Sequence, residues 1–421
     1  MATSGRRKRR PYDRGGRFIR RGAPQGAWVT LWFRIGGSVN SIERVRAAVN
    51  REPVDKVPLG FYLVDCDTVS RVIGHETYVR NNIQTRIAFW EGRRDEVVES
   101  YKKDTVEFYN RMDLCDLIVF KEAPIVPPKG WVPEDPPKRV SDELWRDSVG
   151  RVWKFSEISN DFVIVEDPTP KDEEFSAERF AAEIEDVAPD PSIFEAFDYL
   201  VEHLGQERYI GGYSGGLRVF GILGINERNM MAFLLQPEAM KAAIDYWRRW
   251  GNTMDKYYVR PGQSGVFIEE DSGGTNGPMV SPAMYREFSY PAMKSRVESI
   301  KRYRDQVLMH NCGDNRPLVD MFIDAGIMCY QSLQTNAGMY IPDLQEKWGD
   351  RMSFWGGVAT ELLVEGTAAE VRANVRDVMT KAGPRGGFIL GPSHSVAYGT
   401  KYDNFMAMLD EFDKLREKVV R

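Results

Sequence analysis

Cysteine and histidine are both scarce in this sequence, with four of each among 421 residues. The cysteines, at positions 66, 115, 312 and 329, are too few and too scattered for a disulfide framework, which favours a reducing, cytoplasmic setting. No apolar run approaches the roughly 20 residues of a membrane-spanning helix, and nothing resembles a secretory signal. We therefore expect neither a membrane protein nor a disulfide-stabilised secreted protein.

A strong net charge is also missing. The formal charge of -5 gives no general reason to expect nucleic acid or an anionic membrane as a partner. Residues 1–22 are the exception, because they carry nine Lys and Arg without any hydrophobic period. This stretch could be an arm for nucleic acid or for an acidic partner. We favour a disordered, solvated extension over residues 1–40, ahead of a folded domain over residues 41–421.

Eight short apolar runs recur along the rest of the chain, and amphipathic helical sequence separates most neighbours. The runs span residues 57–63, 116–120, 208–214, 265–271, 306–313, 327–333, 352–358 and 386–394. Runs that are continuously apolar indicate strands covered on both faces, as in a parallel sheet wrapped in helices. The count of eight favours a (β/α)8 TIM barrel over an open doubly wound sheet.

An insertion is expected after the second strand, within residues 121–190. The chain first becomes proline-rich, as PIVPPKGWVPEDPPK, and two stretches of alternating polarity follow, RVWKFSEI and FVIVED. Alternation of this kind is typical of antiparallel strands with one buried face. We predict a small proline-rich and antiparallel segment inserted into the barrel domain.

Histidine and cysteine meet at the end of the fifth predicted strand, in MHNCGD. Residues two apart in a strand share a face, so His310 and Cys312 point the same way, and His394 ends the eighth strand. Active sites of TIM barrels gather at these carboxyl ends. Imidazole and thiolate suit Zn²⁺, whereas the alternative is a hydrogen-bonded histidine beside a buried cysteine. The barrel context and His394 favour a metal site.

A carboxylate cluster, Glu269 to Asp271, ends the fourth predicted strand. Glu270 is the candidate for a fourth metal ligand or a catalytic proton donor, with Asp271 as the second catalytic candidate. The alternative is that these carboxylates are solvated or cap the following segment. Five further residues are candidates for lining a substrate pocket: Tyr62, Tyr213, Asn276, Gln334 and Trp355. Cys115 and Cys329 are expected to be core residues.

Several longer motifs carry a resemblance to a known family. They are ERVRAAVNREPVDKVPLGF, EEDSGGTNGPMVSPAMYREFSYP, MHNCGDNRPLVDMFIDAGIMCYQSLQTNAGM, KWGDRMSFWGGVAT and GGFILGPSH. With these motifs in order, the chain from about Asn40 onward resembles the uroporphyrinogen decarboxylase (URO-D) superfamily, which includes cobalamin-dependent methyltransferases. The resemblance implies the TIM barrel independently of the strand count.

The sequence departs from the decarboxylase at one place that matters. The decarboxylase carries an arginine-rich segment after its first strand, which binds the carboxylates of its tetrapyrrole. Here that segment reads PLGFYLVDCDTVSRV, without paired arginines. A multiply charged porphyrinogen would lack its main electrostatic anchors, so we do not favour this substrate.

The methyltransferase branch is similar in its H-x-C pair, and the resemblance implies that His310 and Cys312 bind zinc. Many of those relatives place a further cysteine after the last strand, in a Pro-x-Cys setting. Here the stretch reads GPSH, so His394 would substitute. That exchange removes one negative charge, leaves a more Lewis-acidic metal and favours polarising a neutral oxygen.

The resemblance implies a zinc-dependent methyltransferase that moves a methyl group from a methoxylated compound to a corrinoid protein. Methoxylated aromatic compounds are the main candidate donors. No Asp-x-His-x-x-Gly loop is present, so the cobalamin would arrive on that partner. The alternatives are a methylcobamide:thiol (coenzyme M) or folate methyltransferase, a decarboxylase-like tetrapyrrole enzyme, and a non-catalytic corrinoid or tetrapyrrole binder. A homodimer stays open.

Overall fold

The structure is a computed structural model that describes residues 39–120, 125–156, 160–168, 175–214, 219–224 and 226–420. The basic extension predicted over residues 1–40 lies outside the described residues, except for its last two positions. The division into an extension and a domain over residues 41–421 therefore stays a prediction.

Eight parallel strands form one sheet in the order of the chain. They are β1 (Gly60–Phe61), β2 (Leu117–Val119), β7 (Tyr209–Tyr213), β8 (Gly265–Glu269), β11 (Val307–His310), β12 (Cys329–Gln331), β13 (Ser353–Val358) and β14 (Phe388–Pro392). A parallel bridge joins Leu59 to Leu390, and the Leu390 N–H donates to the Pro58 carbonyl at 2.9 Å. Since the first and last strands meet in this way, the sheet closes and the predicted TIM barrel is confirmed.

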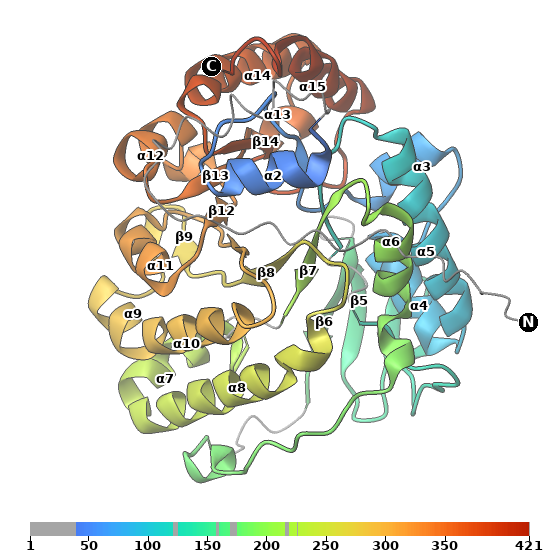
Figure 1. The fold of residues 1–421 in the computed structure, drawn as a ribbon. Helices are drawn as coiled ribbons and strands as arrows, with labels where there is room; N and C mark the ends of the chain where they lie inside the picture. The colour runs from blue at the N-terminus through green and yellow to red at the C-terminus, as the bar shows by residue number, and fades with distance from the viewer. Residues whose placement is uncertain are drawn as a thin grey trace, which may run out of the picture. The chain divides into compact units, whose positions relative to one another are not determined.

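Helices follow the strands around the barrel in chain order, from α3 in blue to α15 in red (Figure 1). They are α2 (Ser41–Val49), α3 (Cys66–Ile73), α4 (Asn82–Trp90), α5 (Arg94–Arg111), α6 (Glu195–Leu204), α7 (Glu227–Leu235), α8 (Pro237–Tyr258), α9 (Pro282–Phe288), α10 (Tyr290–Ile300), α11 (Val319–Ala325), α12 (Ile341–Trp348), α13 (Thr360–Val364), α14 (Ala368–Ala382) and α15 (Tyr402–Leu415). No helix among these described segments is long and apolar enough to cross a membrane.

Alternate residues of each strand enter two separate apolar layers, because successive side chains of a strand point to opposite faces. One layer fills the barrel, with residues such as Leu117, Phe267, Leu308, Cys329 and Trp355. The neighbouring positions join the larger layer between the sheet and the helices, as Ile118, Ile268, Met309, Tyr330 and Phe354 do. This double burial explains why the strands read as continuous apolar runs.

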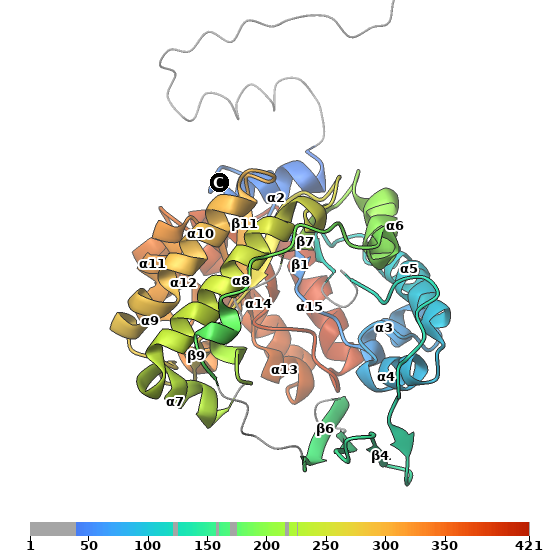
Figure 2. The same ribbon diagram turned by 90° about the horizontal axis from the view of Figure 1, so that it is seen from below.

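Helix α2 covers the amino-terminal end of the barrel. Its start is fixed by a capping box, in which the Asn40 side chain accepts from the Glu43 N–H and the Glu43 carboxylate accepts from the Asn40 N–H. Val45 and Val49 pack into the same apolar cluster as the barrel interior. Figure 2 shows α2 at one end of the barrel and the insertion strands toward the other end.

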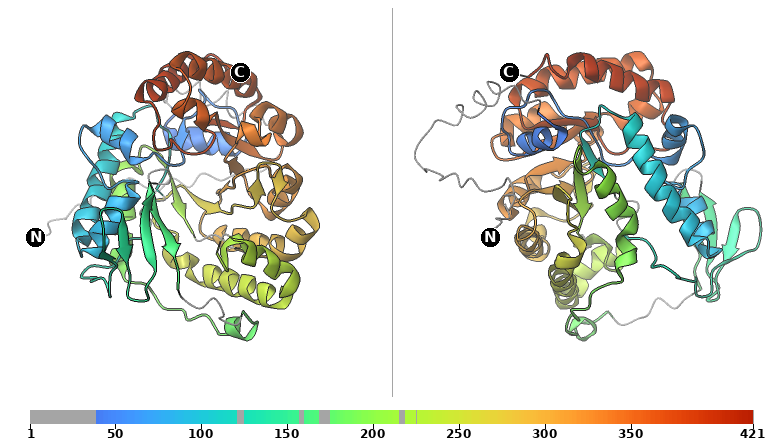
Figure 3. Two further views of the ribbon diagram at one scale, coloured as in Figure 1. Left: turned by 180° about the vertical axis from the view of Figure 1, so that it is seen from behind. Right: turned by 45° about the vertical axis from the view of Figure 1, so that its right-hand side comes forward.

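The insertion between β2 and α6 contains a four-stranded antiparallel sheet, which confirms the predicted antiparallel segment. Its strands are β3 (Lys138–Arg139), β4 (Leu144–Arg146), β5 (Val152–Ser156) and β6 (Asp161–Glu166), of which the sequence predicted the last two. Phe162 and Trp145 pack on Ile83 and Trp90 of α4, so the sheet lies outside the barrel (Figure 3). Residues 121–124, 157–159 and 169–174 of the predicted insertion lie outside the described residues.

Candidate metal centre

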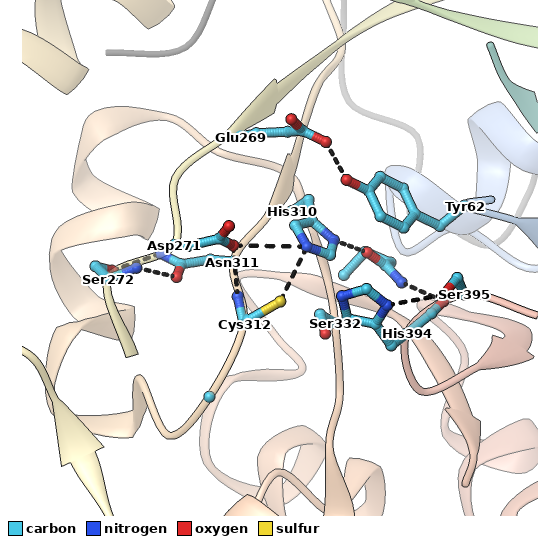
Figure 4. A network of polar contacts seen from close by, with 12 residues as sticks. Tyr62, Glu269, Asp271, Ser272, His310, Asn311, Cys312, Ser332, His394 and Ser395 are labelled. Atoms are coloured by element: carbon cyan, nitrogen blue, oxygen red, sulfur yellow. Dashed lines mark hydrogen bonds and ion pairs between the residues drawn. The ribbon is translucent and has the colours of Figure 1, made fainter. Parts of the chain in front are cut away.

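His310, Cys312 and His394 meet at the carboxyl-terminal end of the barrel, as Figure 4 shows. One ligand atom from each lies within 4.8 Å of the other two. His310 ends β11, Cys312 follows in the loop before α11, and His394 follows β14. Two distant parts of the sequence thus bring three soft or borderline donors to one point.

The spacing of these donors fits a zinc ion. Zinc–nitrogen and zinc–sulfur bonds of about 2.0 to 2.3 Å put tetrahedral ligand atoms roughly 3.3 to 3.8 Å apart. The Nε2 of His310 lies 3.1 Å from the Sγ of Cys312, and the rings of His310 and His394 are 5.1 Å apart at 82°. Small movements of side chains would give tetrahedral geometry, with the fourth position left for another ligand.

The loop that carries Cys312 is held by a buried polar network. The Asn315 amide donates to the Cys312 carbonyl at 2.7 Å, and the Tyr330 hydroxyl donates to the Asn311 carbonyl at 2.7 Å. Gly313 has a φ of 78°, and a Cβ there would lie 2.4 Å from the carbonyl carbon of Gly273. A glycine is therefore required directly after Cys312 for the loop to turn against its neighbour.

Tyr62, which follows β1, covers one face of His310. The two rings stack with centroids 4.0 Å apart and an interplanar angle of 13°. The Tyr62 hydroxyl donates a hydrogen bond to the Glu269 carboxylate. Burial raises the pKa of Tyr62 far above its usual value, and the Glu269 charge raises it further, so the phenol stays protonated. Tyr62 and Glu269 thereby restrict the orientation of the His310 ring.

Asp271 lies beside the His/Cys cluster. Its Oδ1 is 3.7 Å from the Nε2 of His310 and accepts from the Cys312 N–H at 3.4 Å. The Asp271 side chain is 55% exposed, so solvent reaches it. Of the two carboxylates predicted to be catalytic, Asp271 is the one that approaches the three donors.

Glu270 lies on the opposite face of its segment, which differs from the predicted role as a ligand. Phe267 and Glu269 of β8 face the barrel interior, so the intervening Ile268 and the following Glu270 face the helices. There the Tyr285 hydroxyl of α9 donates to the Glu270 carboxylate. Burial raises the pKa of Glu270 to about 7, and one of its carboxylate oxygens has no hydrogen-bond partner.

The remaining predicted pocket residues are spread over different parts of the barrel. Trp355 is fully buried inside it, where its indole N–H donates to the Gly60 carbonyl at 3.1 Å. Gln334 accepts from the Gly313 N–H at 2.9 Å, next to Cys312. Tyr213 lines a small cavity with aromatic residues of the helix layer, and Asn276 is exposed between β9 (Gly273–Gly274) and β10 (Gly277–Pro278). Tyr62 is the member of this set that contacts the cluster.

Gln331 is the contact that the sequence analysis missed. Its side chain bonds the Nδ1 of His310 and, at 3.2 Å, the His394 carbonyl. Part of the signal was present in the sequence, because Gln331 lies near the end of its predicted strand as His310 does. The pairing of the two residues in register is seen in the structure. Gln334 was predicted instead, because the sequence does not fix the register between β11 and β12.

The fold and this cluster define a closed (β/α)8 barrel with a candidate metal centre at its carboxyl-terminal end. The family model for uroporphyrinogen decarboxylase (URO-D) matches residues 160–415, and the chain belongs to this family. This confirms the family resemblance that the motifs indicated.

Among solved structures, the fold resembles that of a methyltransferase from Methanosarcina mazei. The two chains are 16% identical, the match covers 90% of this chain and 99% of that one, and the TM-score is 0.59. At this identity the likeness establishes a shared barrel fold. A search of curated proteins finds no match.

Proposed function

We propose that this protein is a zinc-dependent methyltransferase. It moves a methyl group from a methoxylated compound to a corrinoid carried by a partner protein, and methoxylated aromatic compounds are the main candidate donors. The observation that carries the proposal is the convergence of His310, Cys312 and His394 in a URO-D family barrel. A cytoplasmic location and a single barrel domain over residues 41–421 belong to the same proposal.

When bound by these residues, a zinc ion would act as a Lewis acid that withdraws charge from an ether oxygen. The donor set supports an oxygen substrate, because two neutral imidazoles and one thiolate supply a single negative charge. A second thiolate in place of His394 would lower the electrophilicity of the site. Tyr62 and Gln331 hold His310 so that its Nε2 faces the other two donors.

The transfer would break the carbon–oxygen bond of the donor: both bonding electrons would stay on the oxygen, and a reduced corrinoid on the partner would supply the electron pair that accepts the methyl group. The oxygen left behind must gain a proton. We assign to Asp271 the relay of that proton from solvent, because its half-exposed side chain lies 3.7 Å from His310 Nε2. Glu270 is a weaker candidate, since its carboxylate is buried against Tyr285 on the other face.

The residues after β1 argue against a decarboxylase acting on a carboxylate-rich tetrapyrrole. Asp65 and Asp67 stand in the segment where the decarboxylase has arginines. Asp65 accepts from Arg80 at 2.7 Å, so Arg80 already has a carboxylate partner within the protein. Acidic groups here would repel the carboxylates of such a substrate.

Two measurements test the proposal. Elemental analysis of purified protein should find about one zinc per chain. The zinc-loaded protein should then transfer methyl groups from some member of a methoxyarene panel to free reduced cobalamin. Transfer from methylcobalamin to coenzyme M or to a folate would instead support the reverse methyltransferase. Absence of turnover in both directions with zinc bound would refute the methyltransferase assignment, and tight corrinoid binding without turnover would leave a carrier role.

A further inference from the structure

We propose that Gln331 is a positioning residue that fixes the tautomer of the His310 ring and ties that ring to the backbone of His394. This inference rests on the proposed function only where it concerns zinc. Its first consequence, the state of the His310 ring, holds for the metal-free protein as well.

The orientation of the Gln331 amide follows from its two partners. The His394 carbonyl can only accept a hydrogen bond, so the Gln331 –NH2 group must face it, at 3.2 Å. The Gln331 oxygen is then the atom that faces the Nδ1 of His310. Because a carbonyl oxygen is only an acceptor, Nδ1 must carry the proton.

This assignment leaves the Nε2 of His310 with its lone pair directed at the other donors. Nε2 lies 3.1 Å from Cys312 Sγ, where a zinc ligand is required. A histidine that binds a metal through one nitrogen usually donates its other N–H to an acceptor that orients the ring. Gln331 supplies that acceptor, and it is 1% exposed, so water does not compete for the position.

The same side chain spans the strand that separates the two histidines. In the sheet, β13 lies between β12 and β14, yet Gln331 reaches the His394 carbonyl and the Ser332 hydroxyl reaches the Ser393 carbonyl at 3.2 Å. Gln331 therefore links β12 to the segment after β14, across β13.

Backbone strain at this point supports a functional reason for the arrangement. Ser332 has a φ of 97°, a conformation that residues with a side chain rarely adopt. It is fully buried and directly follows Gln331. Strain of this kind costs roughly 1 to 3 kcal/mol and persists only where surrounding contacts hold it. The two hydrogen bonds to residues 393 and 394 are such contacts.

The test compares Gln331→Met, which keeps the shape and removes both hydrogen bonds, with Gln331→Glu, which keeps an acceptor for Nδ1. Histidine is scarce in this chain, so selective ¹⁵N labelling resolves all four imidazoles. Metal-free wild-type protein and Gln331→Glu should show His310 protonated at Nδ1. Gln331→Met should show the Nε2-protonated form or a mixture of the two.

Zinc affinity provides the second measurement, with Zn²⁺ alone as the probe in competition with a chelator. Gln331→Met should bind zinc about 10- to 100-fold more weakly, and Gln331→Glu should recover most of that loss. Gln345→Met is the matched control. Gln345 is also buried and donates to two backbone carbonyls, but it lies in α12 and those carbonyls belong to Ala382 and Gly386.

The outcomes separate this inference from the proposed function. An unchanged His310 spectrum in folded Gln331→Met would overturn the positioning role, whatever the zinc affinity. If wild type binds zinc, an equal zinc affinity in Gln331→Met would also overturn it. A tautomer change in a protein that binds no zinc would uphold the positioning role and refute the proposed zinc enzyme.

Discussion

The two ends of the barrel differ in how their polar and charged side chains are arranged. At the amino-terminal end, Asp116 is 3% exposed and pairs with Arg44 at 2.7 Å and with Arg416 at 2.8 Å. Arg44 also pairs with Asp55 at 2.7 Å. Burial lowers the pKa of Arg44, but its hydrogen bonds and charge contacts with Asp55 and Asp116 outweigh that effect and raise it overall. Charges here neutralise one another.

At the carboxyl-terminal end, a buried histidine, His310, meets the half-buried Cys312 and His394, and this cluster of three contains no arginine or lysine. His310, Cys312 and His394 direct lone pairs and sulfur toward a common point. Nothing in that set neutralises the others, so the arrangement gains most when a cation joins it. We interpret this difference as a division of roles, with stability assigned to the amino-terminal end and binding proposed for the carboxyl-terminal end, as is usual in TIM barrels.

The largest expected effect comes from Cys312→Ser, which should disrupt the candidate metal centre and leave the ion pairs at the amino-terminal end intact. A neutral hydroxyl replaces the only thiol of the cluster, so zinc affinity should fall by at least 10³-fold and methyl transfer should be lost with it. The metal-free stability should change by less than about 1 kcal/mol, since Cys312 is half-buried in a loop. Zinc titration and chemical denaturation of the metal-free protein measure the two quantities.

Cys329→Ser serves as the control for Cys312→Ser. Cys329 lies inside the barrel, fully buried, as the sequence predicted, and burial raises the pKa of its thiol to about 12. This variant should lose stability and keep its zinc. If Cys312→Ser retained wild-type zinc affinity, the contrast between the two ends would lose its basis.

A second variant, Asp116→Asn, disrupts the buried ion pairs at the amino-terminal end of the barrel. It leaves Arg44 and Arg416 facing a neutral amide in a buried site, so the free energy of unfolding should fall by about 3 kcal/mol. Asp305→Asn removes an ion pair with Arg46 in which the Asp305 side chain is 66% exposed, and should cost less than about 1 kcal/mol. Urea unfolding measures both values.

Zinc binding to Asp116→Asn tests whether the two ends of the barrel are independent of each other. The variant should bind zinc as tightly as wild type under conditions where it is folded, because the two ends share no polar contact in the described residues. A parallel loss of zinc affinity would show that the ends are coupled through the barrel, and the division of roles would then be wrong.

The barrel was predictable because its signal is local. Each strand is buried on both faces, so eight continuous apolar runs could be counted along the chain, and all eight correspond to strands of the sheet. The strands β3 and β4 of the insertion escaped prediction. They are two and three residues long, and β3 is exposed, so they carry too little hydrophobic pattern.

The candidate site was predictable only in part. The two-residue spacing of His310 and Cys312 guarantees a shared face, and both residues meet His394. For the carboxylates, the sequence gives alternation but not which set faces inward, so Glu270 and Asp271 could not be told apart. The sequence also does not show which residues of neighbouring strands pair, and the contact between Gln331 and His310 was missed for this reason.

Glu270→Gln is expected to act on the pH dependence of stability, and it tests the outer face of the barrel wall, which belongs to neither end. In the folded protein burial raises the pKa of Glu270 from its usual 4.5 to about 7. The unfolded chain releases this proton near pH 4.5, so between these two values the folded state binds more protons. Raising the pH through that window therefore destabilises the fold, by on the order of 3 kcal/mol in total.

The amide of Glu270→Gln does not titrate, so this loss should vanish in the variant. The free energy of unfolding of Glu270→Gln minus that of wild type should therefore be larger at pH 8 than at pH 5, by up to that amount. Urea unfolding at both pH values measures it. Glu298→Gln, an exposed exchange in α10, should show no such difference. Zinc affinity should survive in Glu270→Gln, because its side chain contacts Tyr285 rather than His310. If the variant instead lost its zinc, Glu270 would have to reach the metal after a rearrangement, and the carboxylate assigned to the site would no longer be Asp271.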